Sequence, residues 1–412
     1  MKNNFLAVLE TKFVFLWVSQ ILSQITGNLI NFTLTVIIFE RTYSTAAVSL
    51  IWFFYAIPAL ILGPFSGVIV DLVDKRKILI VTNFIQALIV FGYLMFKIKI
   101  WVIYSLIFLY SLVNQLYIPA EGATLPFLLP KNLYPTANTL FMFTVNFTFL
   151  ISFALSGPLI RVLSRENIFL LCGTSLLLAA LAVWFLPKNI IGERKKITNP
   201  IIFFKKLKEG YTYIKNTPLI IFPLVLIIAS QIIVGVLGVT VPIYAKEILN
   251  IPVIDAGLVV VSPAGAGALI GGFLATKKLT QKARKKIIIS SGLSFAAFSF
   301  IFLGLFISLL PPNLRIIFSA IFAFLLGMAF VFLIVPSQTF IQIVTPKKFY
   351  GRIYGVLGFL ITLASIMPIL MIGSLVDLVG VKIILTMIGL FTLGAFLISL
   401  KEPYEIIKNH QV

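Results

Sequence analysis

Long runs of hydrophobic residues, broken by short clusters of charge, proline and glycine, fill most of this 412-residue chain. A bilayer core about 30 Å thick needs roughly 20 apolar residues in a helix, and twelve runs are long enough to serve. They lie at residues 13–39, 46–70, 78–96, 100–120, 137–162, 167–187, 218–245, 254–276, 287–309, 313–336, 353–376 and 380–400. The pattern predicts an all-α membrane protein with twelve transmembrane helices.

One long polar stretch divides these runs into six and six. It is rich in lysine, carries apolar residues at helical spacing, and is typical of a segment that lies along the inner membrane surface. The two halves also repeat each other, since Ser19-Gln20 recurs as Ser230-Gln231. Two pseudo-symmetric six-helix bundles with a substrate site between them are typical of secondary transporters. The expected domains are 1–187 (first bundle), 188–217 (cytoplasmic basic linker), 218–400 (second bundle) and 401–412 (cytoplasmic tail).

Composition and charge agree with this interpretation. Hydrophobic residues make up 60% of the chain and charged residues 11%, far below the quarter that a soluble protein carries. The net charge of +20 does not indicate a nucleic-acid partner, because 25 of the 33 Lys and Arg residues fall on one predicted side of the membrane. The bias predicts a multi-pass protein of the cell membrane with both termini in the cytoplasm.

Few residues are available for catalysis or metal binding. Cys172 and His410 are the single cysteine and histidine, so the sequence offers neither a disulfide framework nor a Cys/His metal site. The acids Asp71 and Glu121 form the one plausible pair, and neither has a His or Cys partner. We therefore expect no enzyme activity, no metal and no cofactor.

Amide side chains form a polar stripe along the first span. They are spaced by three or four residues, which places them on one helix face, and amides are costly against lipid. None of the predicted spans carries an acid or a base clearly at its middle. We therefore predict a substrate cavity of neutral groups, although amides that only join helices would show the same pattern. The predicted binding residues are Gln20, Gln24, Asn28, Asn31, Asn146 and Gln231.

A charged loop between the second and third spans combines a glycine, two acids and three bases. Its residues are Gly67, Asp71, Asp74, Lys75, Arg76 and Lys77. The spacing resembles the loop between helices 2 and 3 of the major facilitator superfamily, although Leu72 stands where the family has a base and Asp74 where it often has glycine. We expect Gly67 to allow a close helix approach. The alternative is that the three bases are only cytoplasmic anchors.

Other segments extend the resemblance over nearly the whole chain. Pro119-Ala120 and the segment from Pro336 to Arg352 are similar to the macrolide-efflux and siderophore-exporter branch, and Ser156-Gly157-Pro158 resembles the core of its antiporter motif. The resemblance implies small-molecule export by antiport. Tyr110 stands where related exporters often have an arginine linked to proton coupling, so that route is in question.

Gating contacts are expected at the cytoplasmic ends of the helices. We predict that Asp71 faces the start of the eleventh helix at Gly351-Arg352, and that Glu121, at the end of the fourth helix, pairs with Lys75 or Arg76. By the resemblance, Gly157 and Pro158 also belong to the moving parts.

Together these features predict a monomeric secondary exporter of a lipophilic or amphipathic small molecule, resembling drug, macrolide or siderophore exporters. Its partners would be the substrate and the lipid bilayer, with protons as the candidate coupling ion. A lysophospholipid flippase of the same superfamily is the alternative within the transporter class. A membrane scaffold without transport activity is the alternative outside it.

Overall fold

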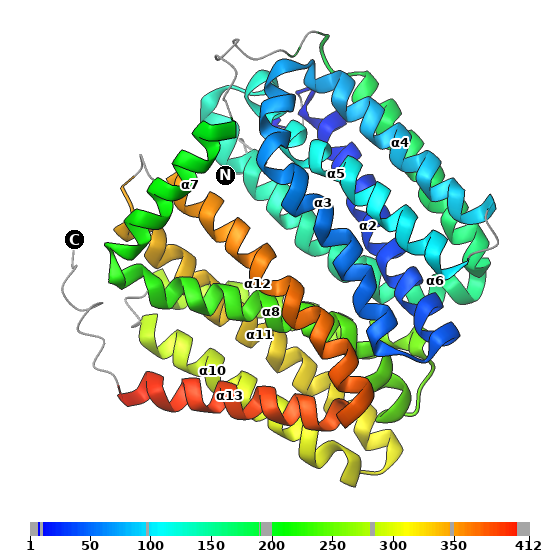
Figure 1. Ribbon diagram of the computed structural model, residues 1–412, viewed down its shortest axis with the longest axis vertical. Helices are drawn as coiled ribbons and strands as arrows, with labels where there is room; N and C mark the ends of the chain where they lie inside the picture. The colour runs from blue at the N-terminus through cyan, green and yellow to red at the C-terminus, as the bar shows by residue number, and fades with distance from the viewer. Residues whose placement is uncertain are drawn as a thin grey trace. The chain divides into compact units, whose positions relative to one another are not determined.

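The computed structural model describes residues 7–8, 11–95, 99–188, 190, 200–280, 285–346 and 350–401 (Figure 1). All regular structure in these ranges is helical, which confirms the predicted fold class. The long helices are α2 (Phe13–Thr42), α3 (Thr45–Leu72), α4 (Lys75–Met95), α5 (Ile100–Leu128), α6 (Tyr134–Trp184), α7 (Pro200–Lys215), α8 (Ile221–Glu247), α9 (Ser262–Thr280), α10 (Lys285–Ile301), α11 (Pro312–Val344), α12 (Tyr350–Val379) and α13 (Val381–Lys401).

Eleven helices of the described chain are long and apolar enough to cross a membrane. One of them, α6, has 51 residues and a break at Ser164, whose φ is 63° and ψ is 164°. At 1.5 Å per residue α6 would be about 75 Å long, more than twice the bilayer core. The two arms of α6 therefore supply two spans, in agreement with the predicted runs 137–162 and 167–187. The described helices thus account for the twelve predicted spans.

Contacts divide the chain into two compact units. Unit 1 comprises Met1–Ile38 and Leu50–Phe203, and unit 2 comprises Phe39–Ser49 and Phe204–Val412. The junction between α2 and α3 thus packs with the second half of the chain. The predicted linker contains the passage from one unit to the other and α7, while its residues 191–199 lie outside the described ranges. The predicted domain limits themselves stay predictions.

In unit 1, α4 packs against α5, and aliphatic side chains of these helices and of α2 form much of the core. Leu16 of α2, Leu79 of α4 and Ala120 of α5 meet in one fully buried cluster. The second arm of α6 lies along α4, where the rings of Tyr93 and Phe169 stack with centroids 5.0 Å apart. Helices that carry apolar side chains on several faces can pack this way only inside a bundle or against lipid.

In unit 2, α9 and α11 approach each other through glycine. A Cβ atom added to Gly267 would lie 1.9 Å from the carbonyl oxygen of Phe324, and one added to Gly327 would lie 1.8 Å from that of Ala264. Small residues at a crossing let two helix backbones come together, and in membranes such packing replaces the hydrophobic effect as a source of association. The register of α9 on α11 therefore depends on these two glycines.

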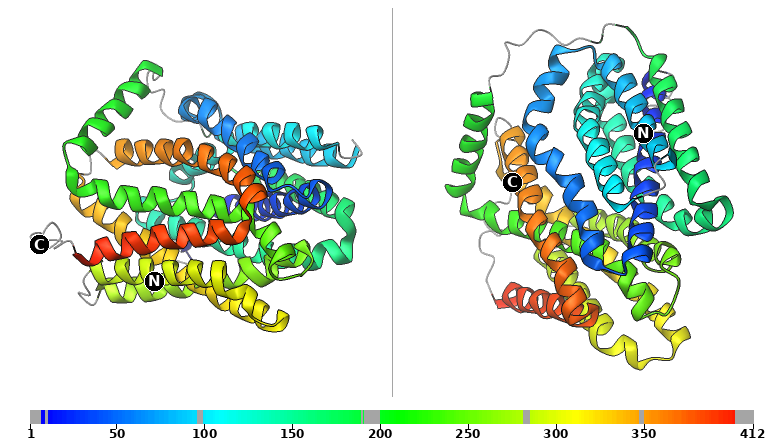
Figure 2. Two further views of the ribbon diagram at one scale, coloured as in Figure 1. Left: turned by 60° about the horizontal axis from the view of Figure 1, so that its bottom comes forward. Right: turned by 45° about the vertical axis from the view of Figure 1, so that its right-hand side comes forward.

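A similar contact joins α10 and α13, which run side by side in Figure 1 and in both views of Figure 2. The α10 helix continues into a π-helical turn, Phe302–Phe306, where a Cβ atom on Gly304 would lie 2.3 Å from Thr386 Oγ1 of α13. A second π-turn, Gly257–Val261, precedes α9. Isolated π-turns are frequent at functional sites. Here the turn at Phe302–Phe306 lets α13 approach α10.

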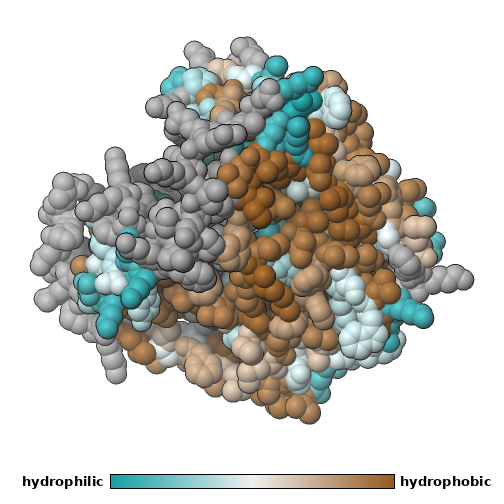
Figure 3. Space-filling view, turned by 45° about the horizontal axis from the view of Figure 1, so that its top comes forward, coloured by the Kyte–Doolittle hydropathy of each residue, from teal (hydrophilic) through white to brown (hydrophobic). Residues whose placement is uncertain are grey.

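Large apolar side chains also cover the outside of the helices. Leu378 is 81% exposed, Phe391 77% and Trp101 75%. On the face seen in Figure 3, hydrophobic residues dominate the surface that the grey residues leave visible, with hydrophilic residues at its margins. Exposed apolar surface of this extent is expected where lipid is the solvent.

Candidate functional site

The predicted amide stripe lies on α2, which runs unbroken through all of its positions. Gln20 is buried at 2% exposure, whereas Gln24, Asn28 and Asn31 are half-buried. At the start of the stripe, the indole Nε1 of Trp17 donates to Thr144 Oγ1 of α6 at 2.7 Å and fixes the rotation of α2. Whether the stripe binds substrate stays a prediction.

Gln20 touches the carboxyl group of Glu121, a pairing that the sequence did not indicate. Gln20 Nε2 donates to Glu121 Oε2 at 3.4 Å, and the Tyr117 hydroxyl donates to Glu121 Oε1 at 3.2 Å. Glu121 is 7% exposed and Tyr117 2%. The carboxyl group is therefore enclosed between α2 and α5 and held by two neutral donors.

The expected position of Glu121 was wrong. We predicted that the fourth span ends at residue 120 and that Glu121 pairs with Lys75 or Arg76 at the membrane surface. The helix instead continues through Pro119 to Leu128. Its next turn is supported by a hydrogen bond from Thr124 Oγ1 to the Ala120 carbonyl at 2.7 Å. Glu121 consequently lies inside the helix, seven residues before its end. The prediction that no span carries an acid at its middle stays a prediction.

A network of small polar groups surrounds this carboxyl group. The Tyr117 hydroxyl lies 3.5 Å from Ser19 Oγ, which accepts from Asn83 Nδ2 at 3.2 Å. Ser23 Oγ then donates to Asn83 Oδ1 at 2.9 Å. The network links α2, α4 and α5 inside unit 1. A change in the hydrogen bonds of Glu121 can therefore alter the hydrogen bonds of all three helices.

A second polar cluster lies between α3, α4 and α5. Gln86 Nε2 donates to Asn114 Oδ1 at 3.4 Å, and Asn114 Nδ2 donates to the Tyr55 hydroxyl at 3.2 Å. Asn83, Gln86 and Asn114 were not among the predicted site residues, although amides inside apolar spans are the signal that would have found them.

Several buried polar atoms in unit 1 have no hydrogen-bond partner. They include Gln20 Oε1, Thr26 Oγ1, Thr33 Oγ1 and Gln86 Oε1, and each residue is buried or nearly so. A buried acceptor without a donor costs about 1–3 kcal/mol. Such atoms fit positions that ordered water molecules can satisfy.

Two of the three bases of the predicted gating loop, Lys75 and Arg76, have partners in unit 1. Lys75 is 2% exposed, and its Nζ donates to the Val70 carbonyl at 3.4 Å and lies 5.5 Å from the Phe127 ring centre. Arg76 Nη2 donates to the Trp184 carbonyl at 2.5 Å, with the guanidinium 5.3 Å from the indole centre. These bases are therefore more than exposed membrane anchors.

The other loop residues differ in role. Asp74 Oδ1 accepts from the backbone N–H of Arg76 at 3.1 Å and so caps the start of α4. Lys77 is exposed. No described atom lies within 4 Å of a Cβ built on Gly67, so the close helix approach that we expected there stays a prediction.

Some predicted site residues cannot be placed by their side chains. Those of Asp71, Asn146 and Arg352 lie outside the described structure, as does any contact at Gly351. Of the other predicted site residues, Gly157 of α6 is buried, Pro158 is exposed, and Gln231 of α8 is half-buried. The predicted contact between Asp71 and the start of α12 thus stays a prediction.

An unexpected contact fixes the start of α3 within unit 2. Asp377 of α12 accepts hydrogen bonds from Ser44 Oγ at 2.8 Å and from the backbone N–H groups of Thr45 at 2.8 Å and Ala46 at 3.1 Å. One carboxylate thereby caps the α3 N-terminus, where the helix dipole favours an anion. We call Ser44, Thr45, Ala46 and Asp377 the α3–α12 clasp.

The backbones come very close beside the clasp. A Cβ atom on Gly373, one turn before Asp377, would lie 2.8 Å from Ala46 Cα and 2.6 Å from Ser49 Oγ. Gly373 therefore lets α12 approach the first turn of α3 closely enough for the carboxylate to reach the N–H groups.

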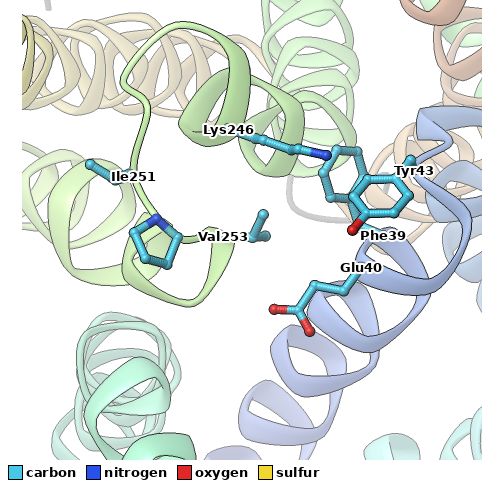
Figure 4. A pocket seen from close by; sticks show the side chains of 7 residues that line it. Phe39, Glu40, Tyr43, Lys246, Ile251 and Val253 are labelled. Carbon is cyan, nitrogen blue, oxygen red and sulfur yellow. The ribbon is translucent and has the colours of Figure 1, made fainter.

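A hollow of about 380 Å³ opens in the same part of unit 2 (Figure 4). The ammonium group of Lys246 points to the aromatic rings there and lies 3.5 Å from the Tyr43 ring centre and 6.0 Å from that of Phe39. Cation–π contacts of this kind are worth about 0.5–2 kcal/mol. Together with the clasp, this contact explains why residues 39–49 pack with the second half of the chain.

Comparison with known sequences gives a consistent answer. The sequence model of the Major Facilitator Superfamily matches residues 16–369. An uncharacterized MFS-type transporter of Bacillus subtilis, YfiS, is 26% identical over 391 residues, which cover 92% of this chain and 91% of that protein. Macrolide efflux protein A of Streptococcus pyogenes is 23% identical over 384 residues, 90% of this chain and 91% of its own.

Solved structures share the fold at low sequence identity. A mutant of the nucleoside transporter NupG superposes with a TM-score of 0.76 at 12% identity and covers 94% of this chain and 99% of its own. A bacterial homologue of the human lysosomal transporter Spinster, crystallised in an inward-facing and unoccupied conformation, gives 0.65 at 12% identity and covers 94% of both chains.

Proposed function

Because this chain belongs to the Major Facilitator Superfamily, a family of membrane transporters, we propose that it is a secondary active transporter that exports a lipophilic or amphipathic small molecule. It is a multi-pass membrane protein, and the proposed location is the cell membrane with both termini in the cytoplasm. The proposal of export is supported by the similarity to macrolide efflux protein A of Streptococcus pyogenes, which extends over 90% of this chain. The same family is not one of enzymes.

The observation that carries this proposal is the stripe of amide side chains along α2 in unit 1. Gln20 leaves a buried acceptor atom without a partner, and the half-buried amides Gln24, Asn28 and Asn31 continue from it along α2. A cavity of amides and aromatic rings suits a solute with few charges, since a phosphate or dicarboxylate would need fixed bases. We propose that this stripe, with Asn146 and Gln231, contacts the substrate.

The proposed mechanism is alternating access, in which contacts that close one end of the molecule break when that end opens. The α3–α12 clasp lies at the predicted outer end, since the positive-inside bias puts residues 43–45 outside. Asp71 and the start of α12 would form its counterpart at the predicted inner end. Proton coupling and a monomeric state complete the proposal.

Accumulation of a lipophilic dye and antibiotic panel in cells that express the protein tests export. We expect lower accumulation than in cells without it, and restoration by a protonophore. Asn31→Leu and Gln24→Leu should change the ranking of the compounds. The control is Thr362→Val, because Thr362 is half-buried on α12 and its hydroxyl donates to the Gly358 carbonyl of its own helix.

Two outcomes would contradict this proposal. Unchanged accumulation across the panel, with the protein present in the membrane, argues against drug-like export, and uptake of a fluorescent lysophospholipid into proteoliposomes would then support a flippase. Unchanged ranking in both α2 variants would show that the stripe only joins helices.

A further inference from the structure

We infer that Glu121 is the residue at which the coupling proton binds and leaves, and that Gln20 transmits its protonation state to the substrate stripe. The inference rests on the proposed transport function. It follows from the place of Glu121 inside unit 1, the neutrality of its partners and the second hydrogen-bonding edge of Gln20.

Glu121 differs from the other acids of the described chain. Asp74 is the other acid that is nearly buried, and it caps the start of α4 at a helix end. The clasp residue Asp377 is exposed, as are Glu166 and Glu247. Glu40, Glu209 and Asp255 are half-buried. Among the acids whose side chains are described, Glu121 is thus the one that is both buried and inside an apolar helix, a setting in which an ionisable side chain usually marks an ion pathway.

No cation of the described structure bonds to this carboxyl group. The titratable group in contact with it is the Tyr117 hydroxyl on its own helix, and α2 contributes the neutral amide of Gln20. Lys75 of α4 bonds the Val70 carbonyl and Arg76 bonds the Trp184 carbonyl. A buried carboxylate without a cation is costly, so its charge can be relieved by a proton or by access of water.

Gln20 gives the proton a way to act on the substrate stripe. When Glu121 is ionised it can only accept, so Gln20 turns Nε2 toward it, as observed, and keeps Oε1 as an unpaired acceptor. When Glu121 binds a proton its O–H can donate, and rotation of the amide would let Oε1 accept that bond. The free edge of Gln20 then becomes the Nε2 donor.

Proton binding thus exchanges an acceptor for a donor on the residue that starts the α2 stripe. A substrate that donates to Gln20 would fit the ionised form, and its departure would accompany uptake of a proton by the carboxylate. The proton would be released to water when unit 1 opens to the other side. This cycle is proton–substrate antiport, with no bond made or broken except the O–H bond at Glu121.

The test uses everted membrane vesicles that contain the full-length protein and a dye from the exported panel. An imposed pH gradient should drive dye uptake by the unaltered protein. In Glu121→Gln vesicles, pH-driven uptake should fall to the level of vesicles without the protein. The variant should still let dye equilibrate down the concentration gradient of the dye. Glu121→Asp should restore part of the driven uptake, and Glu166→Gln, an exposed acid of α6, should keep all of it.

Full pH-driven uptake in Glu121→Gln would overturn the inference, as would uptake driven by a sodium gradient instead of protons. If both Glu121 variants also lose downhill equilibration of the dye, a second measurement on the purified proteins decides whether Glu121 binds the proton. The pH-dependent infrared spectrum of the unaltered protein should contain one carboxyl component that is shifted in Glu121→Asp and absent from Glu121→Gln, while the components of the other acids remain in all three proteins.

The infrared measurement also separates the two proposals. If the unaltered protein moves no dye, the proposed function fails, and a titrating carboxyl band that Glu121→Gln removes would still assign proton binding to Glu121. Identical pH-dependent carboxyl spectra of the unaltered protein and Glu121→Gln would refute the assignment whatever the transport result.

Discussion

The α3–α12 clasp makes a quantitative prediction about how firmly the start of α3 is held on α12 inside unit 2. Asp377→Ala removes three hydrogen bonds and the cap of α3. Hydrogen bonds to a charged group are worth about 1.5–3 kcal/mol each when shielded. Asp377 is exposed, however, and water replaces most of that energy. The loss of a helix cap alone costs about 0.5–2 kcal/mol, so we expect a total of about 1–2 kcal/mol.

A free-energy change of that size alters the ratio of open to closed clasp by a factor of roughly 5–30. The assay is the alkylation rate of a single cysteine at Ser49 in a Cys172→Ser background. Ser49 is 1% exposed and lies against Gly373, so a cysteine there reacts only when the clasp opens. A membrane-impermeant maleimide also reports whether this end faces outward, as the distribution of bases predicts.

Asp377→Ala should therefore raise the alkylation rate about 5–30-fold. Ser44→Ala, which removes one of the three bonds, should raise it less. Glu247→Ala is the matched control, since this exposed acid lies at the end of α8 and should leave the rate unchanged. Equal rates in the Asp377→Ala and Glu247→Ala proteins would refute the view that the carboxylate holds the start of α3 on α12.

Two further predictions concern packing inside each unit. Gly267→Ala should lower the stability of unit 2 by about 1–3 kcal/mol, because its Cβ would lie 1.9 Å from the Phe324 carbonyl oxygen. Thermal unfolding in detergent measures this loss. The control is Gly394→Ala, whose Cβ would meet no described atom within 4 Å. Arg76→Ala should lower the stability of unit 1 by about 1–3 kcal/mol, while Lys77→Ala, at an exposed position, should have little effect in the same assay. A Gly267→Ala protein as stable as Gly394→Ala would contradict the first prediction, and equal effects at Arg76 and Lys77 the second.

The sequence was sufficient to predict the helices and their number, because hydrophobic length is set by bilayer thickness. The two arms of α6 illustrate both the strength and the limit of that pattern. Hydropathy placed the break near Arg161 and Arg165, and the chain turns at Ser164 between them. Yet no hydropathy pattern indicates that the second arm would lie along α4, since that depends on Gly173 meeting Phe91 across 82 residues of sequence.

The charged loop shows what a charge pattern leaves open. Three successive bases predict which side of the membrane a loop occupies, but not where each side chain goes. Lys75 and Arg76 fold back to carbonyl groups and aromatic rings of unit 1, because a long side chain can bury its stem and place its charge on oxygen atoms nearby. The clasp was invisible for a related reason, as Asp377 and Ser44 lie 333 residues apart.

Glu121 was misplaced because proline and a carboxylate next to each other look like the end of a membrane helix. Pro119 removes one backbone donor, which in a membrane is tolerated where neighbouring groups satisfy the freed carbonyl. Glu121 itself is tolerated because Gln20, 101 residues earlier, and Tyr117, one turn earlier, supply donors. Both of these partners were visible as polar residues in apolar runs. An acid beside such residues is thus better interpreted as part of a buried network than as a helix end, and that reasoning connects the α2 stripe to a group that can carry a proton.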